Sequence, residues 1–222
     1  MYSFCSLDGC RDGADPYRAG LIFDPAGNLY GTTENGGNSQ CTATGNGCGV
    51  VFELIPNADG SWKQTVLYRL CSRSSCGDGT NPQTSLIFDR AGNLYGTTVN
   101  GGAAGFGVVF QLTPNADGSW REKVLHSFRG GDGGGPQASL IFDHAGTLYG
   151  TTANGGIHNY GTVFKLVPNS DGGWHETVLH AFYDRPGALP EAGVIFDSAG
   201  NLYGTTFGDS NTTFGSVFEI TP

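Results

Sequence analysis

Three acidic side chains stand where the repeated pattern of this chain breaks, and a pair of carboxylates is what a glycoside hydrolase needs. Glu34 and Asp209 follow Gly-Thr-Thr segments, and Glu191 precedes a recurrent apolar strand. In such an enzyme one acid protonates the leaving oxygen while the other attacks or activates water. Ordinary exposed carboxylates are the preferred explanation of the same residues. A carbohydrate-active glycoside hydrolase or lyase is therefore kept as an alternative function, and the sequence does not decide whether the protein is an enzyme.

Four long polar side chains share one position, three residues before the first apolar strand residue of each repeat. They are Arg18, Gln83, Gln137 and Glu191. If the repeats surround an axis, these side chains converge on one funnel mouth and can hold a polar ligand by hydrogen bonds and a charge pair. In the alternative interpretation, Arg18 and Glu191 simply pair with each other at a seam between neighbouring repeats.

Two further sets of side chains recur beside this position. Asparagines precede Gly-Gly at Asn35, Asn100 and Asn154, and aromatic rings precede the next strand at Phe106, Tyr160 and Phe214. Exposed rings suit stacking on sugar faces, and amides suit sugar hydroxyls. For the asparagines the preferred explanation is that they are turn residues. The rings are equally well explained as fillers between repeats.

The elements that position these side chains are repeated four times. The segment LIFDPAGNLYGTT begins at Leu21 and returns, with small changes, at Leu86, Leu140 and Val194. It predicts two short strands around a tight turn in which Gly supplies a positive φ. A third strand follows, of the type GVVFELIP, and an Asp-Gly turn leads to a fourth, of the type WKQTVLYRL. Each repeat is therefore predicted to be a four-stranded antiparallel meander.

Four such meanders predict a single all-β domain over residues 1–222, a four-bladed β-propeller. The predicted blades span residues 18–70, 83–128, 137–182 and 191–222. The last repeat ends after its third strand, whereas residues 1–4 (MYSF) match the end of the fourth, as in LHSF and LHAF. We therefore predict that residues 1–4 complete the last blade and close the ring. The loops between strands two and three and those between repeats should open on one face.

Composition and cysteine spacing limit the compartment and the partners. The net charge is −9, with 11 Lys+Arg in 222 residues, which argues against nucleic acid, and no apolar run is long enough for membrane insertion. The six cysteines form three local pairs: Cys5 and Cys10, Cys41 and Cys48, Cys71 and Cys76. The spacings fit zinc poorly and favour disulfides, hence an extracellular, periplasmic or cell-surface protein. No metal or cofactor is predicted, and we expect a monomer that binds a glycan or another small polar ligand.

The repeated motifs as a set, including GxVFxLxP and WxExVLHxF, resemble the bacterial tandem-repeat family of GloVer repeats, whose members carry varied surface anchors. The resemblance covers essentially the whole chain. It implies a secreted or surface-associated repeat protein, and it implies no reaction. The first repeat departs from the pattern in its cysteine-containing loops, and the fourth copy replaces Asn-Gly-Gly by other residues. The preferred function is non-covalent recognition of a carbohydrate, and a structural or protein-binding spacer is a further alternative.

Overall fold

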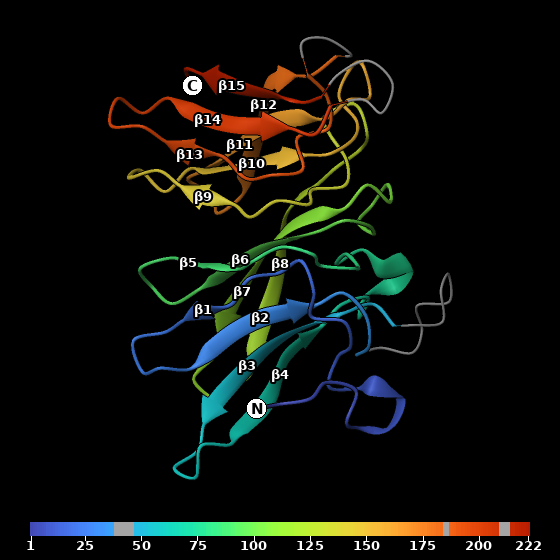
Figure 1. Cartoon of the computed structure of the whole chain (residues 1–222), viewed down its shortest axis with the longest axis vertical. Helices are drawn as coiled ribbons and strands as arrows, with labels where there is room; N and C mark the ends of the chain where they lie inside the picture. Colours follow the sequence, from blue (N-terminus) through green and yellow to red (C-terminus); the bar gives the residue numbers. More distant parts are fainter. Residues whose placement is uncertain (38–46, 184–186, 209–213) are drawn as a thin grey trace.

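The computed structural model describes residues 1–37, 47–183, 187–208 and 214–222. The chain folds into four antiparallel sheets that follow one another in sequence, three with four strands and the last with three (Figure 1). We call each sheet with its loops a module, numbered 1 to 4 along the chain. The only helical segments among the described residues are two 3-10 turns, Asp8–Cys10 and Ser74–Cys76.

Module 1 contains β1 (Ile22–Phe23), β2 (Leu29–Thr33), β3 (Val50–Pro56) and β4 (Trp62–Arg69). Module 2 contains β5 (Ile87–Phe88), β6 (Leu94–Thr98), β7 (Val108–Pro114) and β8 (Trp120–Ser127). Module 3 contains β9 (Ile141–Phe142), β10 (Leu148–Thr152), β11 (Thr162–Pro168) and β12 (Trp174–Ala181). Module 4 contains β13 (Ile195–Phe196), β14 (Leu202–Thr206) and β15 (Ser216–Ile220). Strands form where the repeat predicts them, although the first strand of each module is only two residues long.

A repeated aspartate builds the turn between the first two strands of each module. In module 1 the Asp24 carboxylate accepts hydrogen bonds from the backbone N–H groups of Ala26 and Asn28, at 2.8 and 2.9 Å. The Tyr30 hydroxyl also donates to it, at 3.2 Å. Asp89, Asp143 and Asp197 accept equivalent bonds. Because a short polar side chain can satisfy turn amides, these residues stabilise the hairpin turn.

The hydrophobic core lies between successive modules. A tyrosine of the second strand of one module meets a phenylalanine of the first strand of the next, edge to face. The three pairs are Tyr30 with Phe88, Tyr95 with Phe142 and Tyr149 with Phe196, with ring centroids 5.1, 5.0 and 5.2 Å apart. Such pairs stabilise by about 0.5–1.5 kcal/mol beyond the area that they bury. The modules therefore stack through one repeated interface.

The loops that vary between repeats open on one face, which we call the loop face. Isolated β-bridges join the loop that precedes each module to the loop between its second and third strands. They pair Ala14 with Asn35, Thr80 with Asn100 and Gly134 with Asn154. The predicted grouping of these two kinds of loop is therefore correct, and each loop holds its neighbour through backbone hydrogen bonds.

The predicted closure of the ring by residues 1–4 is not what the structure shows. The side chains of Tyr2 and Phe4 pack on module 1, against the cluster that contains Phe52. The sheet of module 4 has three strands, and among the described residues none pairs with the outer edge of β15. The two termini lie toward opposite ends of the molecule (Figure 1). Residues 1–4 pack on module 1 as the end of a fourth strand packs on the module that follows it, but module 4 does not precede module 1 in space.

Within the described residues, no helix combines the length and apolarity that crossing a bilayer would require.

Candidate functional site

Side chains from three modules meet at the loop face, where the sequence places its polar quartet. Arg18 extends from module 1 to module 3, and its Nη1 donates to Oε1 of Gln137 at 3.5 Å. Residues 119 positions apart are thus joined directly. The predicted alternative, a pair between Arg18 and Glu191, is not present: Glu191 is exposed and lies in module 4. We call the surface around Arg18, Gln137, Gln83 and Glu34 the mouth.

Glu34 and Gln83 form a second contact of the mouth, between modules 1 and 2. The Gln83 amide donates to Oε1 of Glu34 at 2.9 Å. The other carboxylate oxygen, Oε2, is buried and has no hydrogen-bond partner among the described residues. A buried acceptor without a partner costs free energy, so this oxygen is available to a donor that enters the mouth. A hydroxyl group of a ligand has the required chemistry.

Tyr17 is a mouth residue that the alignment of the repeats missed. Module 1 has one more residue between its proline and its first apolar residue, Pro16 to Leu21, than module 2 has between Pro82 and Leu86. The extra residue is accommodated at Arg18, whose φ of 71° lies in the left-handed region. Tyr17 is exposed, and the Arg18 guanidinium lies 5.4 Å from its ring centroid. An alignment anchored on proline would have placed Tyr17 beside Gln83.

The repeated asparagines are engaged within the protein. Besides the backbone bridges of the loop face, the Asn35 amide donates to Asp15 at 2.8 Å and the Asn100 amide to Asn81 at 3.4 Å. Asn154 accepts from Thr152 through its backbone oxygen. These contacts favour the turn interpretation over direct ligand binding.

The predicted stacking rings have three different environments. Phe106 is partly exposed but lies flat against Gly130 and Gly134, where added Cβ atoms would come within 3.1 and 2.9 Å of its ring. Tyr160 packs against the core cluster between modules 3 and 4. Phe214 is fully exposed. Phe106 and Tyr160 therefore contact neighbouring loops or modules, although Phe106 remains 43% exposed, and Phe214 is presented fully to solvent.

In its described ranges, the structure shows no direct contact between the predicted catalytic carboxylates. No hydrogen bond links Glu34 with Glu191 within the part of the chain that the structure describes, and Asp209 lies outside it. The sequence argument for catalysis therefore gains no support from the geometry.

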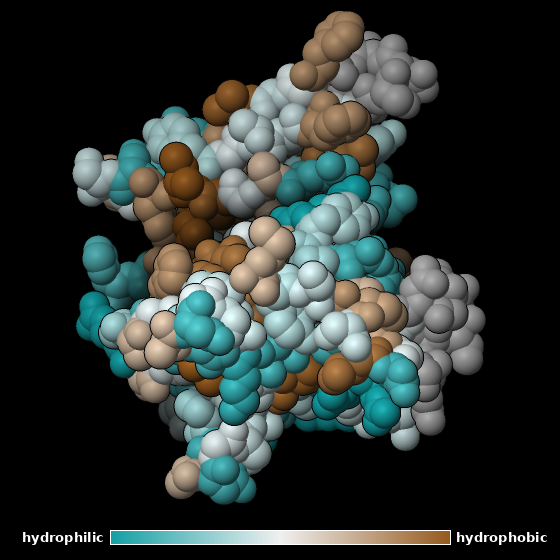
Figure 2. Space-filling model, turned by 60° about the horizontal axis from the view of Figure 1, so that its bottom comes forward, coloured by the Kyte–Doolittle hydropathy of each residue, from teal (hydrophilic) through white to brown (hydrophobic). Residues whose placement is uncertain are grey.

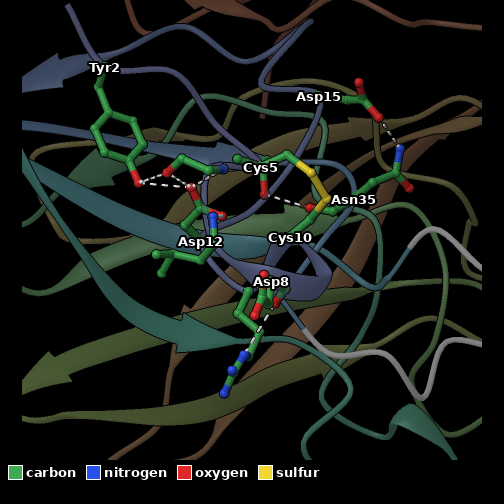
Figure 3. Close-up of a disulfide and its surroundings, with 11 residues drawn as sticks. Tyr2, Cys5, Asp8, Cys10, Asp12, Asp15 and Asn35 are labelled. Atoms are coloured by element: carbon green, nitrogen blue, oxygen red, sulfur yellow. Dashed lines mark hydrogen bonds between the residues drawn. A yellow bond between two sulfur atoms is a disulfide. The ribbon is translucent and has the colours of Figure 1, made fainter.

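Two of the three predicted disulfides are present and have the same form. Cys5 bonds with Cys10 and Cys71 with Cys76, each with a Cα–Cα distance of 4.0 Å. Cys48 is also disulfide-bonded and fully buried, while its predicted partner Cys41 lies outside the described residues. Figure 3 shows the first disulfide between the Tyr2–Asp12 and Asp15–Asn35 hydrogen bonds. The disulfides cross-link the loops of the loop face. A cysteine in a disulfide has no thiolate to offer to zinc.

The loops before modules 1 to 3 each hold an aspartate that a side chain from the preceding strand contacts. The Tyr2 hydroxyl donates to Asp12 at 2.8 Å, and the Tyr68 hydroxyl donates to Asp78 at 2.8 Å. Between modules 2 and 3, His126 Nε2 lies 3.1 Å from Asp132. Tyrosine and histidine at this position therefore make the same contact with the aspartate of the loop.

Each of these aspartates lies near a polar residue of the following module's fourth strand: Gln64, Glu122 or Glu176. The Gln64 amide donates to the Asp12 backbone oxygen at 3.0 Å. Glu122 is buried and ion-paired with Arg73, whereas Glu176 lies within 4.8 Å of His126 and Asp132. Burial raises the pKa of Glu176 to about 7, and the Asp132 charge adds to this. Burial also raises the pKa of Glu122 to about 7, although Arg73 opposes the change.

Two shallow pockets lie outside the mouth. A pocket of about 470 Å³ is bounded by Ser6, Leu7, Asp8, Arg11 and Arg69, beside the first disulfide. Another, of about 490 Å³, lies between the hairpin turns of modules 2 and 3, where Arg90 and His144 border it. The first belongs to the loop face and the second to the opposite face. Basic side chains border both pockets, although the whole chain is acidic.

The repeat identifies the family. The profile described as the Gloeobacter/Verrucomicrobia repeat matches residues 40–222, most of the chain. The chain belongs to this bacterial repeat family. No curated protein matches it in sequence.

Two solved structures align with most of this chain at low sequence identity. The extracellular domain of a protein named as a one-component system, from B. thetaiotaomicron, aligns with a TM-score of 0.50 and 16% identity, over 83% of this chain and 20% of that one. A protein of unknown function from Dyadobacter fermentans aligns with a TM-score of 0.48 and 13% identity, over 91% of this chain and 63% of that one. This chain thus spans only a fifth of the length of the first. At such identities the likeness concerns the fold alone.

Proposed function

We propose that this chain is an extracytoplasmic ligand-binding protein whose four sheets are the blades of a propeller. We propose further that it binds a carbohydrate at the mouth. One observation carries the proposal: Arg18 of module 1 reaches Gln137 of module 3, so polar side chains of successive modules gather at one place. Loops on a rigid sheet scaffold are a common location for binding residues. The disulfides, and a structural neighbour that is an extracellular domain, support the compartment.

The chemistry of the mouth suits a sugar. Sugar hydroxyls both donate and accept, and the mouth offers a guanidinium, two amides and a carboxylate oxygen that lacks a partner. Tyr17 provides the exposed ring on which a sugar face can stack, in place of Phe106 and Tyr160. Hydrolysis is not proposed, because no contact among the described residues joins Glu34 with Glu191.

Binding to a broad glycan panel tests the proposal, followed by calorimetry on the best ligand. We expect Arg18→Ala and Tyr17→Ala each to weaken binding by about tenfold or more, a loss of about 1.4 kcal/mol. Arg90→Ala is the matched control, since it removes an arginine from the pocket on the opposite face. Absence of binding by the unmodified chain across the panel would refute carbohydrate recognition. Binding that Arg90→Ala abolishes and Arg18→Ala leaves intact would place the site elsewhere.

A further inference from the structure

The two ends of the stack of modules expose side chains that the internal interfaces bury. The first strand of each module is preceded by an apolar residue; Leu86, Leu140 and Val194 are at most 2% exposed, whereas Leu21 is 52% exposed. In the third strand, Val51, Val109 and Val163 are fully buried, whereas Val217 is 77% exposed. We call the exposed side of module 1 the front face and that of module 4 the back face.

The two faces carry the complementary halves of the repeated interface. In each internal interface the preceding module supplies a tyrosine and the following one a phenylalanine. The back face ends on Tyr203, and the front face begins with Phe23, which is 67% exposed. Trp120 and Trp174 pack on the same tyrosines, with ring centroids 6.5 and 6.3 Å away, and Trp62 is their counterpart on the front face. A fourth interface of the same kind would therefore join Tyr203 to Phe23 and Trp62.

A threonine side-chain hydroxyl and a backbone oxygen would also form a hydrogen bond across this fourth interface. Internally, the second-strand threonines Thr32, Thr97 and Thr151 are buried and donate to backbone oxygens of the next module's leading loop. Thr205 is exposed at the equivalent position of the back face. The equivalent acceptor on the front face is the backbone oxygen of a residue in the loop that precedes Leu21.

The N-terminal segment is already in position for this contact. Phe4 packs on Phe52 of module 1 at 4.8 Å, as Phe128 packs on Phe164 at 5.2 Å and Phe182 on Phe218 at 5.1 Å. In module 3 the residue two before Phe182, His180, pairs with Val163. The residue two before Phe4 is Tyr2, and the residue equivalent to Val163 in module 4 is Val217. Residues 1–4 thus present the end of a fourth strand beside the front face, where an edge like that of β15 would dock.

We propose that two copies of this chain associate head to tail, the back face of each on the front face of the other, with residues 1–4 of one copy adding to β15 of the other. Each copy then covers the exposed apolar residues of the other, and both open sheet edges are removed. Front and back faces differ, so the contact is heterologous and two of them close a ring of eight modules. Figure 2, with the end that carries module 1 forward, shows brown patches interrupting a largely teal and white surface. This proposal replaces the expected monomer.

Sedimentation velocity and light scattering over a wide concentration range test the association. The chain has a mass of 23.2 kDa, so the closed pair has twice that, 46.4 kDa. Val217→Asp places a charge on the back face and should weaken association by about tenfold or more. Ile157→Asp is the matched control, because Ile157 is 78% exposed but lies on a loop of module 3. A chain that is monomeric at all concentrations, or a pair that Val217→Asp and Ile157→Asp affect equally, would overturn the proposal.

Cross-linking separates the pair from closure within one copy. Two single variants, Phe23→Cys and Tyr203→Cys, are prepared and then mixed under mild oxidation. We expect a disulfide-linked species of twice the chain mass in the mixture and not in either variant alone. In the double variant, a link that forms at the mass of one chain would show that module 4 closes on module 1 of the same copy and would refute the second copy as the occupant. Larger open assemblies would refute the closed pair.

Discussion

Replacing Glu176 by glutamine should stabilise the protein at neutral and alkaline pH and leave it unchanged in acid. The pKa of the Glu176 carboxyl is raised from 4.5 to about 7 by burial, with the Asp132 charge acting in the same direction. The folded state therefore holds the proton more tightly than the unfolded chain. This contribution to stability is fully present below pH 4.5 and is lost as the pH rises through 7. A glutamine has no proton to lose and is free of this penalty.

The size of the effect follows from the pKa difference. A difference of about 2.5 corresponds to about 3.4 kcal/mol, and partial exposure of Glu176 to solvent reduces this to about 1–2 kcal/mol. For a chain of this length, that is an increase in Tm of about 3–6 °C at pH 8. The natural chain supports the choice of residue, since Gln64 stands at the equivalent position of module 1 and donates to the Asp12 backbone oxygen.

Urea unfolding of wild type and Glu176→Gln at a series of pH values between 4 and 8 measures the effect. The difference in the free energy of unfolding should be close to zero at pH 4 and grow with pH. Gln64→Glu is the converse variant and should lose stability as the pH rises, because it places a carboxylate near Asp12. A difference that is constant with pH, or that grows toward acid, would refute the assignment of Glu176 as the carboxyl that titrates near neutrality.

Two further variants test the packing between modules and the disulfides of the loops. Gly96→Ala should destabilise the protein by about 1–3 kcal/mol, because an added Cβ would lie 2.7 Å from Phe110 and 2.9 Å from Leu86. Gly131→Ala is the control, because a Cβ added there meets no atom within 4 Å. Equal unfolding midpoints for the two variants would contradict this packing. Joint replacement of Cys71 and Cys76 by serine removes a disulfide between residues with a sequence separation of 5. It should lower the free energy of unfolding, measured by urea titration, by about 2 kcal/mol. An unchanged unfolding midpoint would show that the loop is held by its hydrogen bonds alone.

The sequence predicts the strands well because the same signals recur at the same spacing. Recurrent runs of apolar, β-branched and aromatic residues define the strands, and Asp24 and its counterparts define the turns through local hydrogen bonds. Local chemistry of this kind needs no knowledge of distant residues. Closure of the ring was predicted wrongly for the opposite reason. The match of MYSF to LHSF shows that residues 1–4 have the form of a fourth-strand end, and Phe4 does pack as such an end. Sequence similarity does not show which copy of a module supplies the neighbouring strand.

At the mouth and at the interfaces between modules, too, the sequence predicts local features but not contacts between distant residues. The quartet position was found, but the partner of Arg18 could not be, since its contact with Gln137 depends on how successive modules are rotated. Tyr17 was missed because one additional residue shifts the alignment. Gln64, Glu122 and Glu176 recur in the sequence two residues after each tryptophan, as one of several polar positions of the fourth strands. Their burial follows only once the preceding module's aspartate is placed beside them.

The N-terminal loop argues that the front face is built to follow another module. The loop of residues 5–12 repeats the loop of residues 71–78, which connects modules 1 and 2, in its cysteine spacing and its 3-10 turn. Asp12 accepts from the backbone N–H groups of Ser6 and Leu7, as Asp78 accepts from those of Ser72 and Arg73. These hydrogen bonds outweigh burial and lower the pKa of Asp12. The loop before module 1 thus has the conformation of a connection between two modules. A disulfide holds it in that form although module 4 of the same copy does not lie beside it, so the front face is preorganised for a partner and the entropic cost of ordering it on association is reduced.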